Sequence, residues 1–573
     1  MKKKIIHLNT RYEKEMNKQL PWNEYPRPSL VRDSFFCLNG HWDFAVTKER
    51  CCDDYSEKIL VPFPAESRLS GYCKDIPKGS FMHYKREFSL PDGFVKSRVI
   101  LNFGAVDTIC EVFLNGKLVG GHEGGYLPFS FDITELLDEK NTLTVTVKDD
   151  LDKSYPYGKQ TKNRGGMWYT PVSGIWQTVW LESVAENYIT KISVKSDTEE
   201  AKIRIFGGEK KKKLTLVESG EIFEFEGEEI TLSPKEKRLW SPENPNLYNF
   251  VIESGEDRVS SYFALRSITS ENVDGIPRLC LNGKPYLFNG LLDQGYYPDG
   301  IFLPATSDGF KDDILTVKSL GFNMLRKHIK VEPEIFYHLC DTLGIAVFQD
   351  MVNNSDYSFI LDTALPTVGL KRFPDNFRHK SKKSREIFIR EMNATIEHTE
   401  KFPSVLYYTI FNEGWGQFSA DKVYEIAKAK APDKIFDATS GWFVRRKSDV
   451  DSRHVYFKAV KLGRLTERPL VISEFGGYSH RIPGHLSTED NYGYKLYETR
   501  EKFEEGFINL YENEILPLVP KGVSALVYTQ VSDIEDETNG LLTYDRSILK
   551  IDSKRTSSIM KSLAESIEKT EIK

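Results

Sequence analysis

The chain has 573 residues, of which 40% are hydrophobic and 28% are charged, and its formal net charge is −6. This length exceeds what one hydrophobic core supports and predicts roughly three or four domains. A mildly acidic chain of ordinary composition lacks the concentrated basic surface that nucleic acids and anionic membranes require, so we expect neither as a partner.

The cysteines and the start of the chain predict where the protein resides. The seven cysteines are odd in number and show no CxxC spacing, which favours scattered free thiols in a reducing compartment. The basic start is not followed by an apolar signal segment, and no run approaches about 18 apolar residues. We therefore expect a cytoplasmic protein without a membrane-spanning segment.

The first part of the chain consists of short strand-like runs separated by turn signals. Clear examples are residues 40–44, 98–103, 108–114 and 141–147. Asn115-Gly116 between two such runs is a strong hairpin signal. This pattern predicts an antiparallel β-sandwich over residues 1–185. Three further runs predict a second, smaller sandwich over residues 186–268.

From residue 269 onward, strand-like runs alternate with helix-like ones. The predicted strands are 285–292, 322–325, 345–348, 405–411, 435–438, 453–457, 469–473 and 523–528. The predicted helices are 307–319, 333–343, 382–400, 419–430, 488–513 and 555–567. The alternation predicts a (β/α)₈ barrel over residues 269–573. A doubly wound open sheet is the alternative, but no glycine-rich phosphate loop follows any of these strands.

Two of the barrel strands end in a glutamate. Glu413 follows the run 405–411, and Glu474 follows the run 469–473. A (β/α)₈ barrel displays its catalytic groups at these strand ends, and about 60 residues, or roughly three β/α steps, separate the two. A facing pair of carboxyls is the machinery of glycosidic bond cleavage. Either motif alone could be a polar turn that caps a strand, but the pair on one barrel favours catalysis.

Several segments resemble, in the right order, those of glycoside hydrolase family 2, which contains β-galactosidases, β-glucuronidases and β-mannosidases. These segments are residues 26–30, 38–44, 124–134, 173–182, 263–266 and 281–285, together with the two glutamate motifs. The resemblance implies a sugar-binding-type jelly-roll β-sandwich (1–185), an immunoglobulin-like β-sandwich (186–268) and a catalytic TIM barrel (269–573). Because the chain ends after the barrel, we expect the three-domain form of the family.

The resemblance also implies roles for the two glutamates. Glu413 would be the general acid/base and would have to carry a proton near neutral pH. Glu474 would be the ionised nucleophile, and the family implies retention through a covalent glycosyl-enzyme. Asn412 would hydrogen-bond the 2-hydroxyl of the sugar, although a strand-end turn residue is the simpler interpretation.

Five further residues are expected to bind substrate or to support the carboxyls. Arg326 would hold Glu474 ionised through charge-assisted hydrogen bonds, although the commoner family pattern, Arg-x-x-His-x-Pro, reads Arg326-Lys327-His328 here. His328 is the second member of this group, with a structural hydrogen bond as its alternative role. The other three are His454 and Tyr456, which face the same way on one strand, and Trp442, for which stacking on a sugar face is weighed against loop packing. The resemblance implies that a tyrosine near this strand contacts the nucleophile, and a core tyrosine is the alternative role of Tyr456.

The identity of the sugar is the least determined part of the prediction. Glucuronidases of the family carry an Asn-x-Lys motif that holds the substrate carboxylate, and Leu541 stands in the lysine position here. Asp293 and Gln294, which follow the first barrel strand, could bond sugar hydroxyls in place of the histidine-acid pair of galactosidases. A β-galactoside is the first expectation, with glucoside, mannoside and glucuronide open.

The remaining expectations concern partners and rival functions. No metal and no cofactor is predicted, because the histidine-glutamate set that binds magnesium in large β-galactosidases is not found. The expected partner is an oligosaccharide or glycoside substrate, and a homo-oligomer is possible because these are common in the family. A non-catalytic carbohydrate-binding protein and a transglycosylase are the alternative functions.

Overall fold

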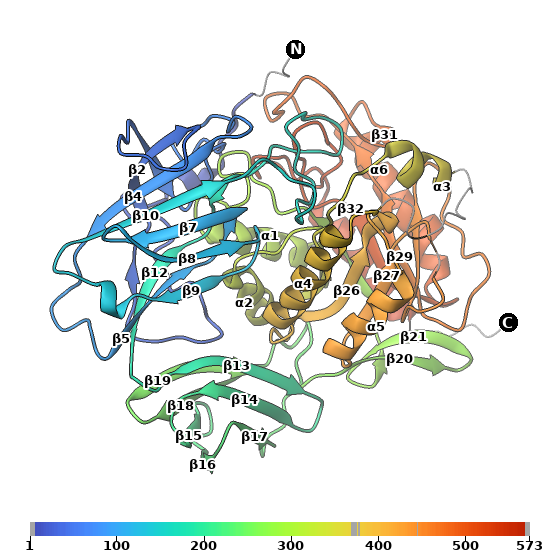
Figure 1. The fold of residues 1–573 in the computed structure, drawn as a ribbon. Helices are drawn as coiled ribbons and strands as arrows, with labels where there is room; N and C mark the ends of the chain where they lie inside the picture. The colour runs from blue at the N-terminus through green and yellow to red at the C-terminus, as the bar shows by residue number, and fades with distance from the viewer. Residues whose placement is uncertain (1–5, 368–374, 376–378, 444, 568–573) are drawn as a thin grey trace.

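The first sandwich packs two antiparallel sheets face to face (Figure 1, blue to cyan). The computed structural model describes residues 6–367, 375, 379–443 and 445–567. The larger sheet has the order β3 (Glu57–Val61), β2 (Gly40–Thr47), β4 (Phe81–Phe88), β10 (Asn141–Lys148), β7 (Ile109–Leu114), β8 (Lys117–Glu123). The smaller has the order β1 (Phe36–Cys37), β12 (Val179–Val184), β5 (Arg98–Phe103), β9 (Phe129–Asp132). Strand β10 shows why these runs form a sandwich, because Leu143, Val145 and Val147 alternate into the core while threonines face outward.

The second sandwich lies below the first in Figure 1 and connects it to the barrel. One sheet contains β13 (Ile189–Ser196), β14 (Ala201–Gly207) and β17 (Glu229–Leu232). The other contains β16 (Ile222–Glu226), β15 (Lys211–Leu216), β18 (Tyr248–Ser254) and β19 (Asp257–Phe263). Their inner faces share one core that includes Ile203, Leu214 and Phe250. The domain boundaries at residues 185 and 268 stay predictions.

The third part is a nearly closed barrel of eight parallel strands, which confirms the predicted fold class. Its order is β27 (Ile435–Thr439), β26 (Val405–Phe411), β25 (Ala346–Asp350), β24 (Met324–Lys327), β23 (Phe288–Asp293), β32 (Val523–Thr529), β29 (Leu470–Gly476), β28 (Asp451–Val455). All of these pairings are parallel. Because both faces of such strands are covered, they read as continuous apolar runs, as β26 does.

Helices cover the outside of the barrel, with α4 and α5 in front of β26 in Figure 1. They are α1 (Asp308–Ser319), α2 (Glu334–Leu343), α4 (Lys382–Thr399), α5 (Ala420–Lys430), α6 (Arg500–Asn509), which continues into η5 (Leu510–Ile515), and α7 (Ser553–Ser566). The predicted helix 488–513 was wrong at its start, because α6 begins only at Arg500. Thr499 caps it by accepting from the Lys502 N–H, and the preceding residues include β31 (Lys495–Leu496), which pairs with β30 (Tyr478–Ser479). None of the helices in the described ranges is both long and apolar enough to cross a membrane.

A loop of the first sandwich, residues 151–172, docks on the barrel. The N–H groups of Tyr157 and Gly158 donate to the carbonyl of Asn353 at 3.1 and 3.2 Å, beyond the end of β25. The Thr170 N–H donates to Oε1 of Glu535 at 2.8 Å. A Cβ on Gly158 would lie 2.8 Å from the Ile329 carbonyl, so only glycine allows this approach. The loop is therefore held against the carboxyl end of the barrel strands.

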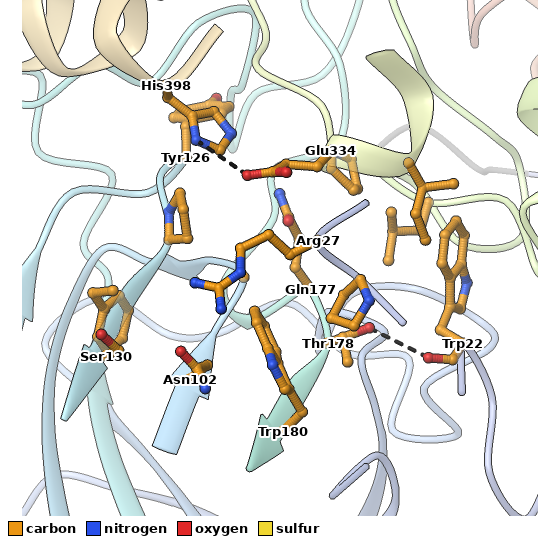
Figure 2. Close-up of a pocket in the computed structure, with 17 residues that line it drawn as sticks. Trp22, Arg27, Asn102, Tyr126, Ser130, Gln177, Thr178, Trp180, Glu334 and His398 are labelled. Carbon is orange, nitrogen blue, oxygen red and sulfur yellow. Dashed lines mark hydrogen bonds and ion pairs between the residues drawn. The ribbon is translucent and has the colours of Figure 1, made fainter. Parts of the chain in front are cut away.

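A second contact between sandwich and barrel forms a pocket of about 150 Å³. Figure 2 shows Arg27 and Trp180 on the sandwich side of this pocket, and Glu334 of α2 and His398 of α4 on the barrel side.

A network of ion pairs joins the two sandwiches. Arg27 pairs with Glu182 at 2.8 Å, and Arg32 pairs with both Glu182 (3.0 Å) and Asp257 of the second sandwich (2.8 Å). This buried network fixes the first sandwich against the second.

Buried carboxyls make the first sandwich sensitive to pH. Glu66 is 8% exposed, and its Oε2 accepts from the Ser173 N–H at 3.0 Å. Burial raises the pKa of Glu66 to about 8, and the charge of nearby Asp149 also raises it. Because the folded-state pKa lies above the unfolded-state value, ionisation of Glu66 destabilises the fold as the pH rises from that unfolded-state value toward about 8.

We predict that Glu66→Gln flattens the loss of stability between pH 5 and pH 8. Glutamine keeps an acceptor for Ser173 but cannot ionise. Since one pKa unit corresponds to about 1.4 kcal/mol, we expect a gain of about 1–3 kcal/mol at pH 8 relative to pH 5. Thermal unfolding at the two pH values measures it, with the exposed Asp92→Asn as the control. An unchanged pH slope in Glu66→Gln would contradict the assignment.

Candidate active site

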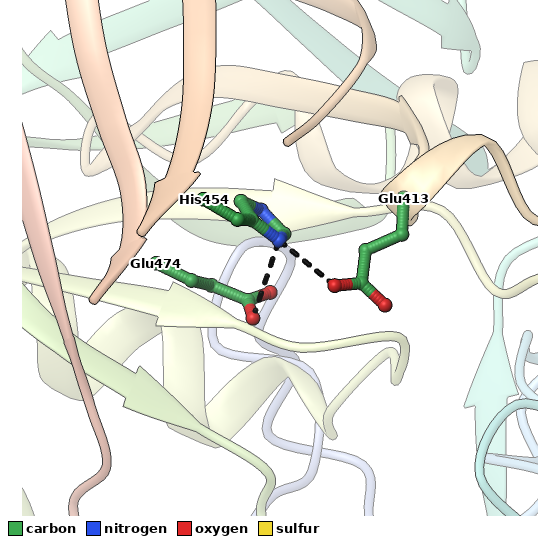
Figure 3. A group of neighbouring side chains, drawn as sticks. All are labelled: Glu413, His454 and Glu474. Atoms are coloured by element: carbon green, nitrogen blue, oxygen red, sulfur yellow. Dashed lines mark hydrogen bonds and ion pairs between the residues drawn. The ribbon is translucent and has the colours of Figure 1, made fainter. Parts of the chain in front are cut away.

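The two glutamates predicted from the strand ends lie side by side in the structure (Figure 3). Glu474 lies on β29, and Glu413 lies in the turn after β26, where its φ of 52° aims it away from the strand direction. One oxygen of each carboxyl and a ring nitrogen of His454 all lie within 4.8 Å of one another. The Glu413 and Glu474 side chains are 12% and 7% exposed. Two acids distant in sequence thus meet at the carboxyl end of the barrel.

Arg326, at the end of β24, organises the residues around Glu474. Its guanidinium donates to Oδ1 of Asp350 (2.9 Å), the Ser473 carbonyl (2.8 Å), Oε1 of Glu474 (3.0 Å), Oδ1 of Asn412 (2.8 Å) and Oγ of Ser440 (3.3 Å). The side chain is 1% exposed. A buried guanidinium with this many hydrogen-bond partners is held in one orientation. Because its positive charge is paired with carboxylates, the free-energy cost of burying it is offset.

Glu474 is held in its ionised form. Burial alone would raise its pKa, but the charges of His454 and Arg326 outweigh burial, so the pKa of Glu474 lies below its ordinary value. Tyr456 donates its hydroxyl to Oε2 of Glu474 at 2.6 Å, which adds to the same effect. A carboxylate prepared in this way suits a nucleophile.

Glu413 has fewer partners than Glu474. Nδ1 of His454 lies 3.0 Å from Oε1 of Glu413 and 3.5 Å from Oε2 of Glu474, so the imidazole lies between the two carboxyls. The Glu413 N–H donates to Oγ of Ser440 at 3.2 Å. Trp415, two residues after Glu413, is 2% exposed.

Asn412 presents its amide nitrogen rather than its oxygen. Oδ1 accepts from Arg326 at 2.8 Å and from the Ser440 hydroxyl at 2.9 Å. No residue in the described part of the chain accepts a hydrogen bond from Nδ2 of Asn412. This amide is therefore oriented to donate to a ligand.

The structure places three other predicted residues around this centre. His328 points Nδ1 at Oδ2 of Asp350 (2.7 Å), so it positions the carboxylate that holds Arg326. Asp293 uses both oxygens within the protein, on Nζ of Lys327 (2.5 Å) and the Gly295 N–H (2.9 Å). Gln294 donates to Gln530 at 3.0 Å, and its own Oε1 is buried without a partner among the described residues.

Aromatic rings form the wall next to His454. Tyr456 stacks on Tyr494, with ring centroids 3.9 Å apart. Trp442 meets His454 edge to face at 5.6 Å and is only 6% exposed, so most of its surface contacts protein. Sequence reasoning did not select Tyr494, which lies in the stretch that was expected to be helical.

The same reasoning did not select Asp350 and Ser440, which contact Arg326, or Glu537 and Lys159, of which Glu537 has a pKa that responds to the charges of Lys159 and Glu474. Asp350 and Ser440 lie at the ends of β25 and β27, so the rule that selected the two glutamates could have found them. Glu537 and Lys159 lie in irregular segments, and Lys159 comes from the first sandwich. No local pattern marks such residues.

The spacing of Glu413, His454 and Glu474 would also suit a small metal ion, because each offers one ligand atom within 4.8 Å of the others. A bound ion would occupy both carboxyls and prevent either from acting in proton or glycosyl transfer. The expectation of a metal-free site stays a prediction.

Comparisons with known proteins agree with the architecture. Residues 75–190 match the family model "Glycosyl hydrolase 2 galactose-binding domain-like", and residues 179–266 match "Glycosyl hydrolases family 2". A β-galactosidase of Clostridium acetobutylicum is 22% identical over 589 residues, covering 89% of this chain and 62% of the relative. A β-galactosidase of Thermoanaerobacter pseudethanolicus is 26% identical and covers 55% of this chain and 46% of the relative. The chain therefore spans about half to three fifths of these curated relatives.

A solved structure matches the fold over nearly its whole length. The β-D-glucuronidase of Dictyoglomus thermophilum has a TM-score of 0.73 at 19% identity, covering 94% of this chain and 98% of that one. A GH2 β-galacturonidase from Eisenbergiella tayi has a TM-score of 0.66 at 19% identity, covering 93% of this chain and 97% of that one. At this identity both similarities establish the fold alone.

Proposed function

The chain belongs to glycoside hydrolase family 2, and from this premise we propose that it is a retaining exo-β-glycosidase. It would remove a terminal β-linked sugar in two displacements through a covalent glycosyl-enzyme. The spacing of the two carboxyls is the observation that carries the proposal.

That spacing favours retention over inversion. Retaining enzymes place their carboxyls about 5–5.5 Å apart, whereas inverting enzymes leave about 6.5–9.5 Å for a water molecule. One oxygen of Glu413 lies within 4.8 Å of one oxygen of Glu474, and this close approach supports the shorter, retaining arrangement. Direct attack by one carboxyl on the sugar is the chemistry that fits.

In the first displacement, ionised Glu474 attacks the anomeric carbon while Glu413 gives its proton to the departing glycosidic oxygen. In the second, Glu413 accepts a proton from water, whose oxygen attacks the same carbon and releases Glu474. Nδ2 of Asn412 is oriented to donate to the 2-hydroxyl, and this bond would strengthen in the transition state. Arg326 holds Glu474 and Asn412 in place together.

Tyr456→Phe is predicted to shift the acid side of the pH profile upward. The variant lacks the 2.6 Å hydrogen bond that favours ionised Glu474, so the pKa of Glu474 rises and activity is lost at a higher pH. A hydrogen bond to a charged group corresponds to a shift of about one pKa unit. The profile of kcat/KM against pH measures it. Tyr424→Phe, which removes a similar 2.7 Å bond between α5 and Asp449, is the control and should not move the profile.

The sequence motifs alone make a β-galactoside the first candidate substrate, with glucoside, mannoside and glucuronide as alternatives. Leu541, which stands where glucuronidases of the family have lysine, is 1% exposed within the main hydrophobic core, so that position offers no cation. Hydrolysis of a panel of p-nitrophenyl β-glycosides tests the proposal. Sugar binding without turnover of any member would instead favour a non-catalytic carbohydrate-binding protein, and products formed at high acceptor concentration would reveal transglycosylation.

A further inference from the structure

The loop at residues 151–172 brings a lysine of the first sandwich to the carboxyl end of the barrel. On one side, Tyr157 Oη donates to the Ser355 carbonyl at 2.8 Å, next to the backbone bonds with Asn353. On the other side, the Gly166 N–H donates to Oδ2 of Asp536 at 3.0 Å, beyond β32. Lys159 lies between these two anchors, directly after the glycine that touches Ile329. Its backbone is therefore fixed beside the loop that carries His328.

Aromatic contacts connect the Lys159 side chain to the segment that follows Glu413. Its Nζ lies 5.7 Å from the ring centroid of Trp168. Trp168 meets Trp415 edge to face at 5.3 Å, and Trp415 follows Glu413 by two positions. Lys159 as a residue is half-buried.

The charge of Lys159 also acts on residues on which the charge of Glu474 acts. Burial lowers the pKa of His328, the charge of Lys159 lowers it further, and the charge of Glu474 opposes this. Burial also raises the pKa of Glu537 to about 7, where Lys159 opposes the rise and Glu474 adds to it. Lys159 and Glu474 thus both act on His328 and Glu537.

Lys159 differs from five cations at this end of the barrel whose side chains are at most 4% exposed and which form ion pairs within the protein. Their ion pairs are Arg326–Glu474 (3.0 Å), Lys327–Asp293 (2.5 Å), Lys330–Glu332 (2.9 Å), Arg546–Asp313 (3.2 Å) and Lys550–Asp533 (2.6 Å). Lys159 forms no ion pair or hydrogen bond through its ammonium with any residue that the structure describes. A cation left unpaired beside a sugar site is available for an anionic substituent of the substrate.

We infer that Lys159 pairs with a carboxylate on the bound sugar, so that the preferred substrate is a β-linked uronide rather than a neutral galactoside. The inference rests on the proposed function and narrows its substrate class. Lys159 then supplies, from another domain, the cation that Leu541 cannot provide. A phosphorylated sugar fits less well, because nearly two negative charges would face Glu413, Glu474 and Glu537.

The test compares kcat/KM for p-nitrophenyl β-glucuronide, β-galacturonide and β-galactoside. The wild-type protein should prefer a uronide. Lys159→Met should lower kcat/KM about 30-fold or more on that uronide, as expected for the loss of a charge-assisted hydrogen bond. It should lower kcat/KM less than about threefold on the galactoside. Lys159→Arg should recover most of the loss. Lys153→Met, which removes another lysine of the loop that pairs with Asp356 at 2.8 Å, should leave both activities unchanged.

Two outcomes would overturn the inference while leaving the proposed function intact: equal losses on charged and neutral substrates, or a wild-type protein that hydrolyses galactoside but no uronide. If no β-glycoside is hydrolysed, the proposed function fails. In that case calorimetric binding of free glucuronate and galacturonate decides the role of Lys159. Binding that Lys159→Met abolishes would support it, and binding that is absent or unchanged would refute it.

Discussion

Glu474→Ala is expected to reduce kcat on every β-glycoside by on the order of 10⁵-fold or more, as removal of a nucleophile does in other enzymes with covalent intermediates. The loss follows from the geometry, because Glu474 is the carboxylate that Arg326, Tyr456 and His454 hold ionised. None of the three can take its place in attacking the anomeric carbon. Steady-state kinetics on an activated aryl glycoside measures the loss.

Azide should partly restore the activity of Glu474→Ala. The shortened side chain leaves space beside the anomeric carbon, and a small anion there can attack in a single displacement. The product would be a glycosyl azide of inverted configuration, which proton NMR identifies. Glu467→Ala, which removes an exposed carboxyl shortly before β29, should keep wild-type activity and show no response to azide. Substantial residual activity in Glu474→Ala, or a rescued product of retained configuration, would remove Glu474 from the nucleophile role.

Glu413→Ala is expected to affect substrates according to their leaving groups. General acid catalysis contributes about 10²–10⁴-fold when the leaving oxygen needs a proton. We therefore expect a loss in that range on alkyl glycosides and disaccharides, and a much smaller loss of the first displacement on 2,4-dinitrophenyl glycosides, whose leaving group departs as the anion. Pre-steady-state measurement of aglycone release isolates that step.

Equal losses on good and poor leaving groups would show that Glu413 is not the acid. Glu425→Ala is a suitable control, because this carboxyl lies on α5 outside the barrel and pairs with Lys447. It should leave both classes of substrate unaffected. Restored rates with azide in Glu413→Ala, giving a product of retained configuration, would further separate the roles of the two glutamates.

The sequence was sufficient for the barrel and for the pair of carboxyls because both leave local patterns. A buried parallel strand is a continuous apolar run, and a glutamate directly after it breaks that run at the functional end of the barrel. Arg326 and Asn412 also lie at the ends of barrel strands, and their roles toward substrate stay predictions. The predicted helix was wrong for residues 488–499. In this segment Gly493 packs so closely on Ser479 that a Cβ on Gly493 would lie 1.9 Å from the Ser479 hydroxyl. Such a contact depends on a segment distant in sequence.

Residues that reach the site from other domains could not be predicted. Lys159 reads locally as a polar loop residue, and its position depends on the docking of the sandwich loop against Asn353 and Asp536. Asp293 illustrates the converse. Its place after the first barrel strand predicted a sugar ligand, but Lys327, from the neighbouring strand, occupies its carboxylate. Pairing between neighbouring strands decides which of the polar strand ends remain available.

The most direct test of the account is covalent labelling with a 2-deoxy-2-fluoro-β-glycosyl fluoride of a sugar that the protein hydrolyses. The fluorine slows both displacements and the reactive leaving group restores the first, so the glycosyl-enzyme should accumulate. Mass spectrometry of the intact chain should show one added fluorosugar, and peptide mapping should place it on Glu474. A label on Glu413 or any other residue would contradict the account, as would steady turnover of the reagent with no adduct at any time.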